Sequence, residues 1–272
     1  MISIVDGINN HIEVMFSCES HITGFYKISY TDKIKGKVKY GQGYYDFDEG
    51  GLLFAAPNQL MGGSEHNGPY SGYSLFIHPD FLLGYPLAKK IKQYGFFSYA
   101  TNEALHLSDA ERNTIIAILK SIETELALPI DDFTQEVLIT QIELLLNYSN
   151  RYYKRQFITR KAVNAGVLQK MEAILDDYIN SEKGIPTVQY LAEQLTISPS
   201  YLSDMLRILT GQNAQYYIHE KLIEKAKEQL TTTNLSVAEI AYKLGFEHSQ
   251  SLSRLFKIKT NMSPVAFRAS FH

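Results

Sequence analysis

Side chains able to read DNA are concentrated in two short segments near the C-terminus. Hydroxyl and amide side chains hydrogen-bond base edges in the major groove, and Arg and Lys bind bases or phosphates. The first segment carries Ser200, Tyr201, Ser203, Asp204 and Arg207. The second carries His248, Ser249, Gln250, Ser251, Ser253, Arg254 and Lys257. These residue types predict two separate contact surfaces for double-stranded DNA.

Both segments belong to a sequence repeat, which predicts how their side chains are positioned. Residues 191–211 align with residues 240–261, at a spacing of 49 in the first half and 50 in the second. Each copy has an apolar run at helical spacing, a short break and a second run. Ala192 and Ala241 occupy the place where two helices must approach closely. The repeat therefore predicts two helix-turn-helix units, with apolar positions facing inward and the polar sets facing outward.

Residues that favour a tight bend separate the two helices of each unit. Gly245 can take the positive φ that a sharp turn often needs, and Thr196 holds the equivalent place in the first unit. Ser198 and Pro199 favour the start of the helix that follows. Between the units, "NAQYYIHEKLIEKAKEQL" predicts a helix of about 17 residues, roughly 25 Å long. Such a connector could hold two recognition helices about one duplex turn, roughly 34 Å, apart.

These C-terminal segments resemble the AraC/XylS family of bacterial transcription regulators. The resemblance is carried by "LAEQLTISPSYLSDMLRILTGQ", "YIHEKLIEKAKEQL" and "SVAEIAYKLGFEHSQSLSRLFKIKTNMSPVAFR", over about residues 167–270. It implies a seven-helix DNA-binding domain with two helix-turn-helix units. It also implies that the protein acts as an activator or a repressor of transcription through contact with RNA polymerase.

Among the positions that depart from the family pattern, two bear on the turn geometry and on DNA contact. Asn261 stands where the family usually has Gly, but Asn tolerates the left-handed conformation, so we expect the turn to survive. Asp204 replaces a basic residue of many members. Because phosphate would repel an acid, we expect Asp204 to cap, to pair with a base donor or to contact the protein itself.

The N-terminal part alternates as strands do. "FYKISY" places Tyr26, Ile28 and Tyr30 on one face, and Lys27 and Ser29 on the other. Clusters of Gly and Asp separate several such short runs, a pattern that favours a small barrel or sandwich.

Aromatic residues at alternating positions offer a candidate pocket. Tyr26, Tyr30, Tyr45 and Phe47 could line a site for a small-molecule effector, or they could fill the barrel core. The N-terminal half resembles, more weakly, the cupin-like effector domain of the same family. We expect no metal, no cofactor and no catalytic residue, because no His-x-His occurs. The scattered histidines are His11, His21, His66 and His78.

Two helices should follow the strands. Ser108 and Glu111 form a predicted capping box for the first, and the second covers about 132–150. The resemblance places a dimerisation element here, so a homodimer through 108–150 is expected, although the pair could merely cover the barrel. Residues 154–166 are polar and basic, with little apolar periodicity, and are predicted to be a linker.

The predicted fold class is α+β with two domains. An N-terminal cupin-like β-barrel with an antiparallel helix pair, residues 1–153, is the expected effector and dimerisation domain. The linker 154–166 then leads to an all-α DNA-binding domain, 167–272, in which a linker helix joins two helix-turn-helix units.

Charge and composition fit this division. The formal net charge is −3, but residues 154–272 hold 15 Lys and Arg against 11 Asp and Glu, giving +4. Cys18 is the single cysteine, so no internal disulfide can form, and a reduced compartment is expected. The apolar runs are too short to span a bilayer, and we see no signal peptide. We therefore expect a cytoplasmic protein that does not bind a membrane.

Two other functions fit the sequence less well. A metal-dependent cupin enzyme with a helical appendage is the main alternative, and the missing histidine cluster argues against it. A general chromosome-binding protein would rely on phosphate neutralisation, for which a net charge of +4 is weak. A sequence-specific regulator, not an enzyme, is the function that the sequence favours.

Overall fold

A computed structural model of the chain shows two compact units, residues 1–159 and 160–272. The structure describes residues 1–8, 13–14, 21–31, 37–40, 43–46, 51–61, 68–69, 71–100, 103–181 and 183–271.

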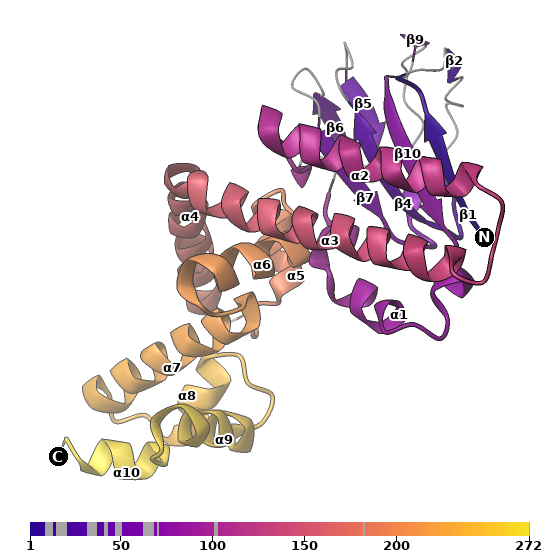
Figure 1. The fold of residues 1–272 in the computed structure, drawn as a ribbon. Helices are drawn as coiled ribbons and strands as arrows, with labels where there is room; N and C mark the ends of the chain where they lie inside the picture. Colours follow the sequence, from indigo (N-terminus) through magenta and orange to yellow (C-terminus); the bar gives the residue numbers. More distant parts are fainter. Residues whose placement is uncertain are drawn as a thin grey trace. The chain divides into compact units, whose positions relative to one another are not determined.

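The first unit is built on an antiparallel sheet (Figure 1). Its order is β1 (Ile2–Asp6), β10 (Gly72–Ile77), β4 (Tyr26–Thr31) and β7 (Gly51–Ala55). Three two-stranded sheets accompany it: β2 (Glu13–Val14) with β9 (Gly68–Pro69), β3 (His21–Ile22) with β8 (Leu60–Met61), and β5 (Lys37–Tyr40) with β6 (Gly43–Asp46).

One face of the four-stranded sheet forms the apolar core of this unit. Tyr26, Ile28 and Tyr30 point to this face, as the alternation predicted, and all three are buried. The rings of Tyr26 and Phe97 meet edge to face, with 5.1 Å between their centroids. Two residues of the candidate pocket are thus packed core side chains. Phe47 lies outside the described residues, as does the side chain of Tyr45, which belongs to β6.

Helices follow the sheet. Short turns come first: η1 (Pro79–Leu82), α1 (Leu87–Lys90), η2 (Ile91–Gln93) and η3 (Gly95–Ser98). The two long helices are α2 (Asp109–Ala127) and α3 (Thr134–Thr159), which pack side by side and run along the sheet in Figure 1. The predicted capping box is confirmed, because Ser108 accepts from the Glu111 amide and Glu111 accepts from the Ser108 amide.

The segment 154–166, expected to be a polar linker, is helical. Helix α3 runs on to Thr159, and the next helix begins at Lys161. Tyr153, Gln156 and Phe157 are buried on α3, so this part of the helix does have an inward face. The inward face could not be recognised from apolar periodicity, because one of the three buried side chains is a polar Gln.

The second unit is all helical. Its described residues form α4 (Lys161–Asn180), α5 (Val188–Gln194), α6 (Pro199–Thr210), α7 (Ala214–Thr232), α8 (Val237–Lys243), α9 (Ser249–Thr260) and α10 (Pro264–Ala269). These are the seven helices that the family resemblance implied. Side-chain oxygens accept from backbone amides at most helix starts, so the short helices begin at defined residues. These capping residues are Thr187, Ser198, Asn213, Ser236 and Ser263.

The apolar positions of the repeat form the core of this unit, as predicted. Leu191, Leu202, Ile240 and Leu252 are each no more than 1% exposed. The predicted fold class is confirmed: an antiparallel β unit with a helix pair precedes an all-α unit in which a helix joins two helix-turn-helix motifs. Among the described residues, no helix has the length and apolar character needed to cross a membrane.

Candidate nucleic-acid interface

The two helix-turn-helix bends have the same backbone geometry. Thr196 has a φ of 58° and Gly245 a φ of 84°, so both lie in the left-handed region, as the alignment of the repeat predicted. Such a conformation costs little for Gly but strains a residue with a side chain. The first bend carries that strain at a threonine, so positive φ alone does not explain the glycine in the second.

A close approach explains Gly245. A Cβ built on Gly245 would lie 2.2 Å from the carbonyl carbon and 2.4 Å from the Cα of Gly184. Gly184 lies between α4 and α5, so the second bend rests on backbone from the start of the same unit. No side chain fits there without moving backbone.

The hydrogen bonds of the two bends also match. After each turn residue, an amide donates back to the alanine carbonyl: Ile197 to Ala192 at 3.0 Å, and Phe246 to Ala241 at 2.9 Å. Both alanines are fully buried. The prediction that small residues lie where the helices approach is consistent with this packing.

The two second helices end alike as well. Gly211 closes α6 with a φ of 80°, and Asn261 closes α9 with a φ of 58°. Each donates its amide to the residue four before it, Gly211 to Arg207 at 3.0 Å and Asn261 to Lys257 at 2.9 Å. The expectation that Asn261 preserves the turn is confirmed.

On α6, the predicted contact residues have unequal exposure. Ser200, Ser203 and Asp204 are half-buried, and Arg207 is exposed. The Nη1 atom of Arg207 donates to Oδ1 of Asp204 at 2.5 Å, one turn apart on the helix. The basic residue is therefore neutralised by its neighbour, and Asp204 contacts the protein, one of the roles expected for it.

Tyr201 is a correction. It was expected to face outward but is only 9% exposed. Tyr201 stands one turn before Met205, which is fully buried, so both lie on the inward stripe of α6. The polar residues around Tyr201 suggested an outward face, but its aromatic ring packs into the core of the unit.

On α9, the predicted residues form a more open and more cationic surface. Ser249 and Ser253 are half-buried, while the others are exposed. No acidic side chain among the described residues pairs with Arg254 or Lys257. The exposed residues are His248, Gln250, Ser251, Arg254 and Lys257.

The start of α9 differs from the start of α6. Ser198 caps α6 by accepting from the Tyr201 amide at 3.2 Å. His248 holds the N-cap position of α9, and its side chain makes no cap hydrogen bond. The Ser251 amide donates to the His248 carbonyl at 3.0 Å, but the amides of Ser249 and Gln250 have no partner among the described residues. Phosphate oxygens are well suited to such a position at a helix start.

The connector α7 is fastened to α4. The Tyr217 hydroxyl donates to a carboxylate oxygen of Glu172, and Lys221 pairs with Asp176 at 3.5 Å. Burial, followed by the hydrogen bond to Glu172, raises the pKa of Tyr217 above its ordinary range. The hydroxyl therefore stays protonated as a donor.

The same connector is fastened to α9. Lys259 pairs with Glu220 at 2.9 Å, and its ammonium lies 2.8 Å from the centroid of the Tyr216 ring. Sequence reasoning missed Lys259 as a positioning residue, because the two partners lie about forty residues before it and no local pattern links them.

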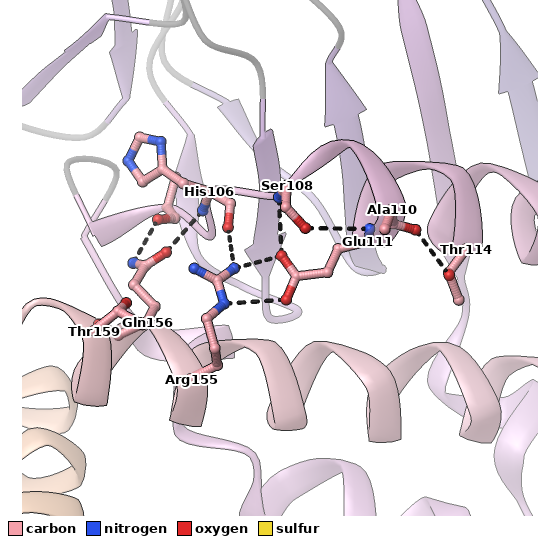
Figure 2. A network of polar contacts seen from close by, with 9 residues as sticks. His106, Ser108, Ala110, Glu111, Thr114, Arg155, Gln156 and Thr159 are labelled. Atoms are coloured by element: carbon pink, nitrogen blue, oxygen red, sulfur yellow. Dashed lines mark hydrogen bonds and ion pairs between the residues drawn. The ribbon is translucent and has the colours of Figure 1, made fainter.

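A second polar network fastens the end of α3 within the first unit (Figure 2). Arg155 donates to both carboxylate oxygens of Glu111, at 2.6 and 3.1 Å, and to the His106 carbonyl at 2.8 Å. Gln156 accepts from the His106 amide at 2.9 Å and donates to the Ala104 carbonyl at 3.2 Å. The last turns of α3 are thereby held against the strand-like segment that precedes α2.

That segment is itself part of the sheet. Leu105 and Leu52 exchange two backbone hydrogen bonds, at 3.0 and 3.1 Å, so the segment pairs with the edge strand β7 through one antiparallel bridge. A continuous set of hydrogen bonds thus runs from the sheet to the final turns of α3.

Two families match the chain. The family described as "AraC-like ligand binding domain" matches residues 12–136, and the one described as "Helix-turn-helix domain" matches residues 191–270. The two matches coincide with the β unit and with both helix-turn-helix motifs.

Relatives agree with this assignment. An uncharacterised HTH-type transcriptional regulator of Bacillus subtilis, YfiF, is 24% identical over 92% of this chain and 79% of its own length. The HTH-type transcriptional activator RhaS of Escherichia coli is 31% identical over 57% of this chain, a match that spans about half, 52%, of RhaS. Among solved structures, the C-terminal domain of the response regulator YesN from Fusobacterium nucleatum is 31% identical over 38% of this chain and 98% of that domain, with a TM-score of 0.35.

These findings set aside the cupin enzyme. The chain has a ligand-binding N-terminal domain and a DNA-binding helix-turn-helix domain, and it belongs to the AraC family of transcriptional regulators.

Proposed function

We propose that this regulator reads a specific DNA sequence by inserting α6 and α9 into two successive major grooves. The observation that carries the proposal is the duplicated bend, with left-handed residues at Thr196 and Gly245 and a polar outer face on each second helix. The connector α7 has 19 residues and is therefore about 28 Å long, close to the pitch of the duplex.

The two helices contribute unequally in this proposal. Arg254 and Lys257 on α9 are exposed and unpaired among the described residues, so they supply base and phosphate contacts. The only cation in the α6 set, Arg207, is neutralised by Asp204. Helix α6 therefore reads bases mainly through Ser200 and Ser203 and adds little to the salt dependence of binding.

We also propose that a small-molecule effector binds the N-terminal domain and changes how the DNA-binding domains are presented. The hydrogen bonds from β7 through Leu105 to Gln156 offer a physical link, because movement of the edge strand would be felt by the last turns of α3. The effector acts by favouring one of two arrangements.

We also propose that the protein forms a homodimer through residues 108–150. The turn between α2 and α3 and the outer side of α3 expose several large apolar side chains, a feature of protein interfaces. These are Leu128, Ile130, Phe133, Val137 and Leu144. We further propose that the protein works in the cytoplasm, contacts RNA polymerase and activates transcription; the relative RhaS is named a transcriptional activator.

Selection of bound sequences from a random DNA pool tests this function, with the full-length chain at near-physiological salt. The expected result is two short motifs about ten base pairs apart, and their duplication if the protein is a dimer. The variant Arg254→Ala should relax the motif read by α9 only, and Lys243→Ala, an exposed cation on α8, is the matched control. Recovery of no enriched sequence, with or without candidate effectors, would refute specific reading.

A further inference from the structure

Both ends of the recognition helix α9 are fastened to the part of the chain that carries α6. At its first end, the bend at Gly245 lies so close to Gly184 that a Cβ would be 2.2 Å from the Gly184 carbonyl carbon. Gly184 stands three residues before Thr187, which caps α5, the first helix of the first helix-turn-helix unit. The bend that leads into α9 therefore rests against the start of the first unit.

Lys259 fastens the other end of α9. It lies in the last turn of that helix, and its ammonium contacts both the Glu220 carboxylate and the face of the Tyr216 ring. Tyr216 and Glu220 lie in the first two turns of α7, and three residues separate α7 from the end of α6. The contact therefore joins the two recognition helices by a short path, whereas the chain itself connects them through all of α7 and α8.

The Lys259 contact is better shielded from solvent than an ordinary surface ion pair. The Lys259 side chain is 10% exposed, and that of Glu220 is 42% exposed. A desolvated ammonium is attracted more strongly to an aromatic face than an exposed one, and salt screens it less. Breaking the contact is costly, because it leaves a largely buried cation without its partners. A helix held in this way at one end, and by backbone packing at the other, can neither slide nor pivot.

We infer that these two contacts set the distance between the two DNA motifs that one chain can bind. With α9 fixed relative to α6, the two helices fit motifs at one spacing and lose contacts at any other. One inserted base pair moves the second motif by about 3.4 Å along the duplex and turns it by roughly a tenth of a turn. Lys259 is a positioning residue in this inference, since its partners lie on α7 and not on DNA. The inference rests on the proposed function and adds that the protein reads spacing as well as base sequence.

Binding to DNA with altered spacing tests the inference. The full-length chain is titrated, by fluorescence anisotropy, with duplexes that carry both selected motifs, either at the selected spacing or with one base pair inserted or removed between them. The wild-type chain should lose about tenfold in affinity at either altered spacing, because one helix gives up base contacts. Lys259→Met should bind the original duplex more weakly but lose only about threefold on the altered ones, because α9 can then follow the displaced motif. Lys259→Arg should restore the preference, because Arg keeps both the charge and the ring contact.

Lys225→Met is the matched control. Lys225 lies on α7 and pairs with Glu228 of the same helix at 3.6 Å. Its replacement removes a partly buried charge from the unit without releasing α9, so the spacing preference should remain. If Lys259 were only structural, Lys259→Met would lower the Tm and leave the spacing preference unchanged. If Lys259→Met does not fold, Tyr216→Leu, which removes the ring contact from the half-exposed side of α7, takes its place.

A distance measurement without DNA tests the fixed arrangement by itself. Spin labels are attached at Gln194→Cys on α5 and Lys243→Cys on α8, both exposed positions, in a chain whose single cysteine, Cys18, is replaced by serine. Pulsed electron paramagnetic resonance, in an excess of unlabelled chain, gives the distance within one molecule. The expected result is one narrow distance, which Lys259→Met should broaden and Lys259→Arg should keep.

Two results overturn the inference: an unchanged spacing preference in Lys259→Met, or a broad range of distances in the wild-type chain. The distance measurement does not involve DNA. A narrow distance together with failed DNA selection would therefore refute the proposed DNA reading alone. A broad distance together with two enriched motifs would refute the fixed spacing alone.

Discussion

Replacement of Gly245 tests whether the second bend is held by its contact with Gly184 or only by its turn conformation. Gly245→Ala introduces a Cβ into the left-handed region, which costs about 1–2 kcal/mol, partly offset by a stiffer unfolded chain. It also places that Cβ 2.2 Å from the carbonyl carbon of Gly184, which is backbone and cannot rotate away. Overpacking of this kind adds about 1–3 kcal/mol.

Gly211→Ala is the matched control. Gly211 has nearly the same φ, 80° against 84°, but a Cβ there meets nothing within 4 Å. Its substitution therefore measures conformational strain alone, about 1 kcal/mol. Gly245→Ala should cost about 3 kcal/mol, the sum of strain and overlap.

A third variant separates the two causes at the same position. Asn adopts the left-handed conformation with little strain, as Asn261 does at the end of α9. If the turn alone mattered, Gly245→Asn would be close to neutral. If the contact with Gly184 matters, Gly245→Asn should still destabilise the protein by about 2 kcal/mol, the cost of the overlap alone.

Thermal unfolding of the full-length chain, followed by circular dichroism, measures these differences. For a unit of this size, 1 kcal/mol corresponds to a shift in Tm of about 4 °C. We expect the Tm of the helical unit to fall by about 4 °C in Gly211→Ala, about 12 °C in Gly245→Ala and about 8 °C in Gly245→Asn. A Tm for Gly245→Asn close to that of the wild-type chain would refute the argument from close approach.

Other predictions concern DNA binding and the polar network of the first unit. Arg254→Ala should reduce the binding free energy by roughly 1–3 kcal/mol at its own base step, whereas Lys257→Ala should weaken binding to all sequences alike and lower the salt slope of the affinity by about one. Fluorescence anisotropy over a salt series measures both effects. Equal losses of affinity on all DNA from both variants would contradict this division. His248→Ser should stabilise the protein by about 0.5–1 kcal/mol in denaturant titrations, because the new serine side chain caps α9. The same variant should weaken DNA binding, because that side chain competes with phosphate for the amides at the helix start. Unchanged DNA affinity would show that these amides do not bind phosphate. Glu111→Gln retains a residue suited to the capping box but removes the charge facing Arg155. The variant should therefore lower the free energy of unfolding by about 0.5–1 kcal/mol at low salt and by less at high salt. A loss of stability that does not depend on salt would mean that the pair acts through packing.

The unequal charge of the two recognition helices has a consequence for how such a protein finds its site. Non-specific affinity depends on phosphate neutralisation, and the unpaired cations lie on α9. Helix α9 should therefore govern the first, salt-dependent encounter with DNA. Helix α6 should contribute mainly to discrimination, since its hydroxyls distinguish base edges without adding net charge.

Much of the fold of the helical unit could be predicted from local sequence. The repeat placed Leu191 and Ile240 in the core and the bends at Thr196 and Gly245, because helical periodicity and turn chemistry act over a few residues. The cap at Ser198 and the tolerated Asn261 were predicted for the same reason. The alternation in β4 likewise gave its two faces, because side chains on a strand alternate by geometry alone.

Contacts between distant segments could not be predicted in this way. Tyr201 was assigned outward because its neighbours are polar, yet the width of the buried stripe depends on what packs against α6. The predicted linker is helical, and its buried Gln156 bonds to backbone some fifty residues earlier, a contact that no local pattern reveals.

The sequence by itself determined the helices, the bends and the residue types that face outward, since these depend on neighbours along the chain. Only the tertiary structure decided which of those residues are free to act. It paired Arg207 with Asp204, placed the Lys27 ammonium near the Phe76 ring and set Gly245 against Gly184. The physical reason is that charge pairing, desolvation and close packing depend on distances in space, and folding brings together residues that the sequence keeps apart.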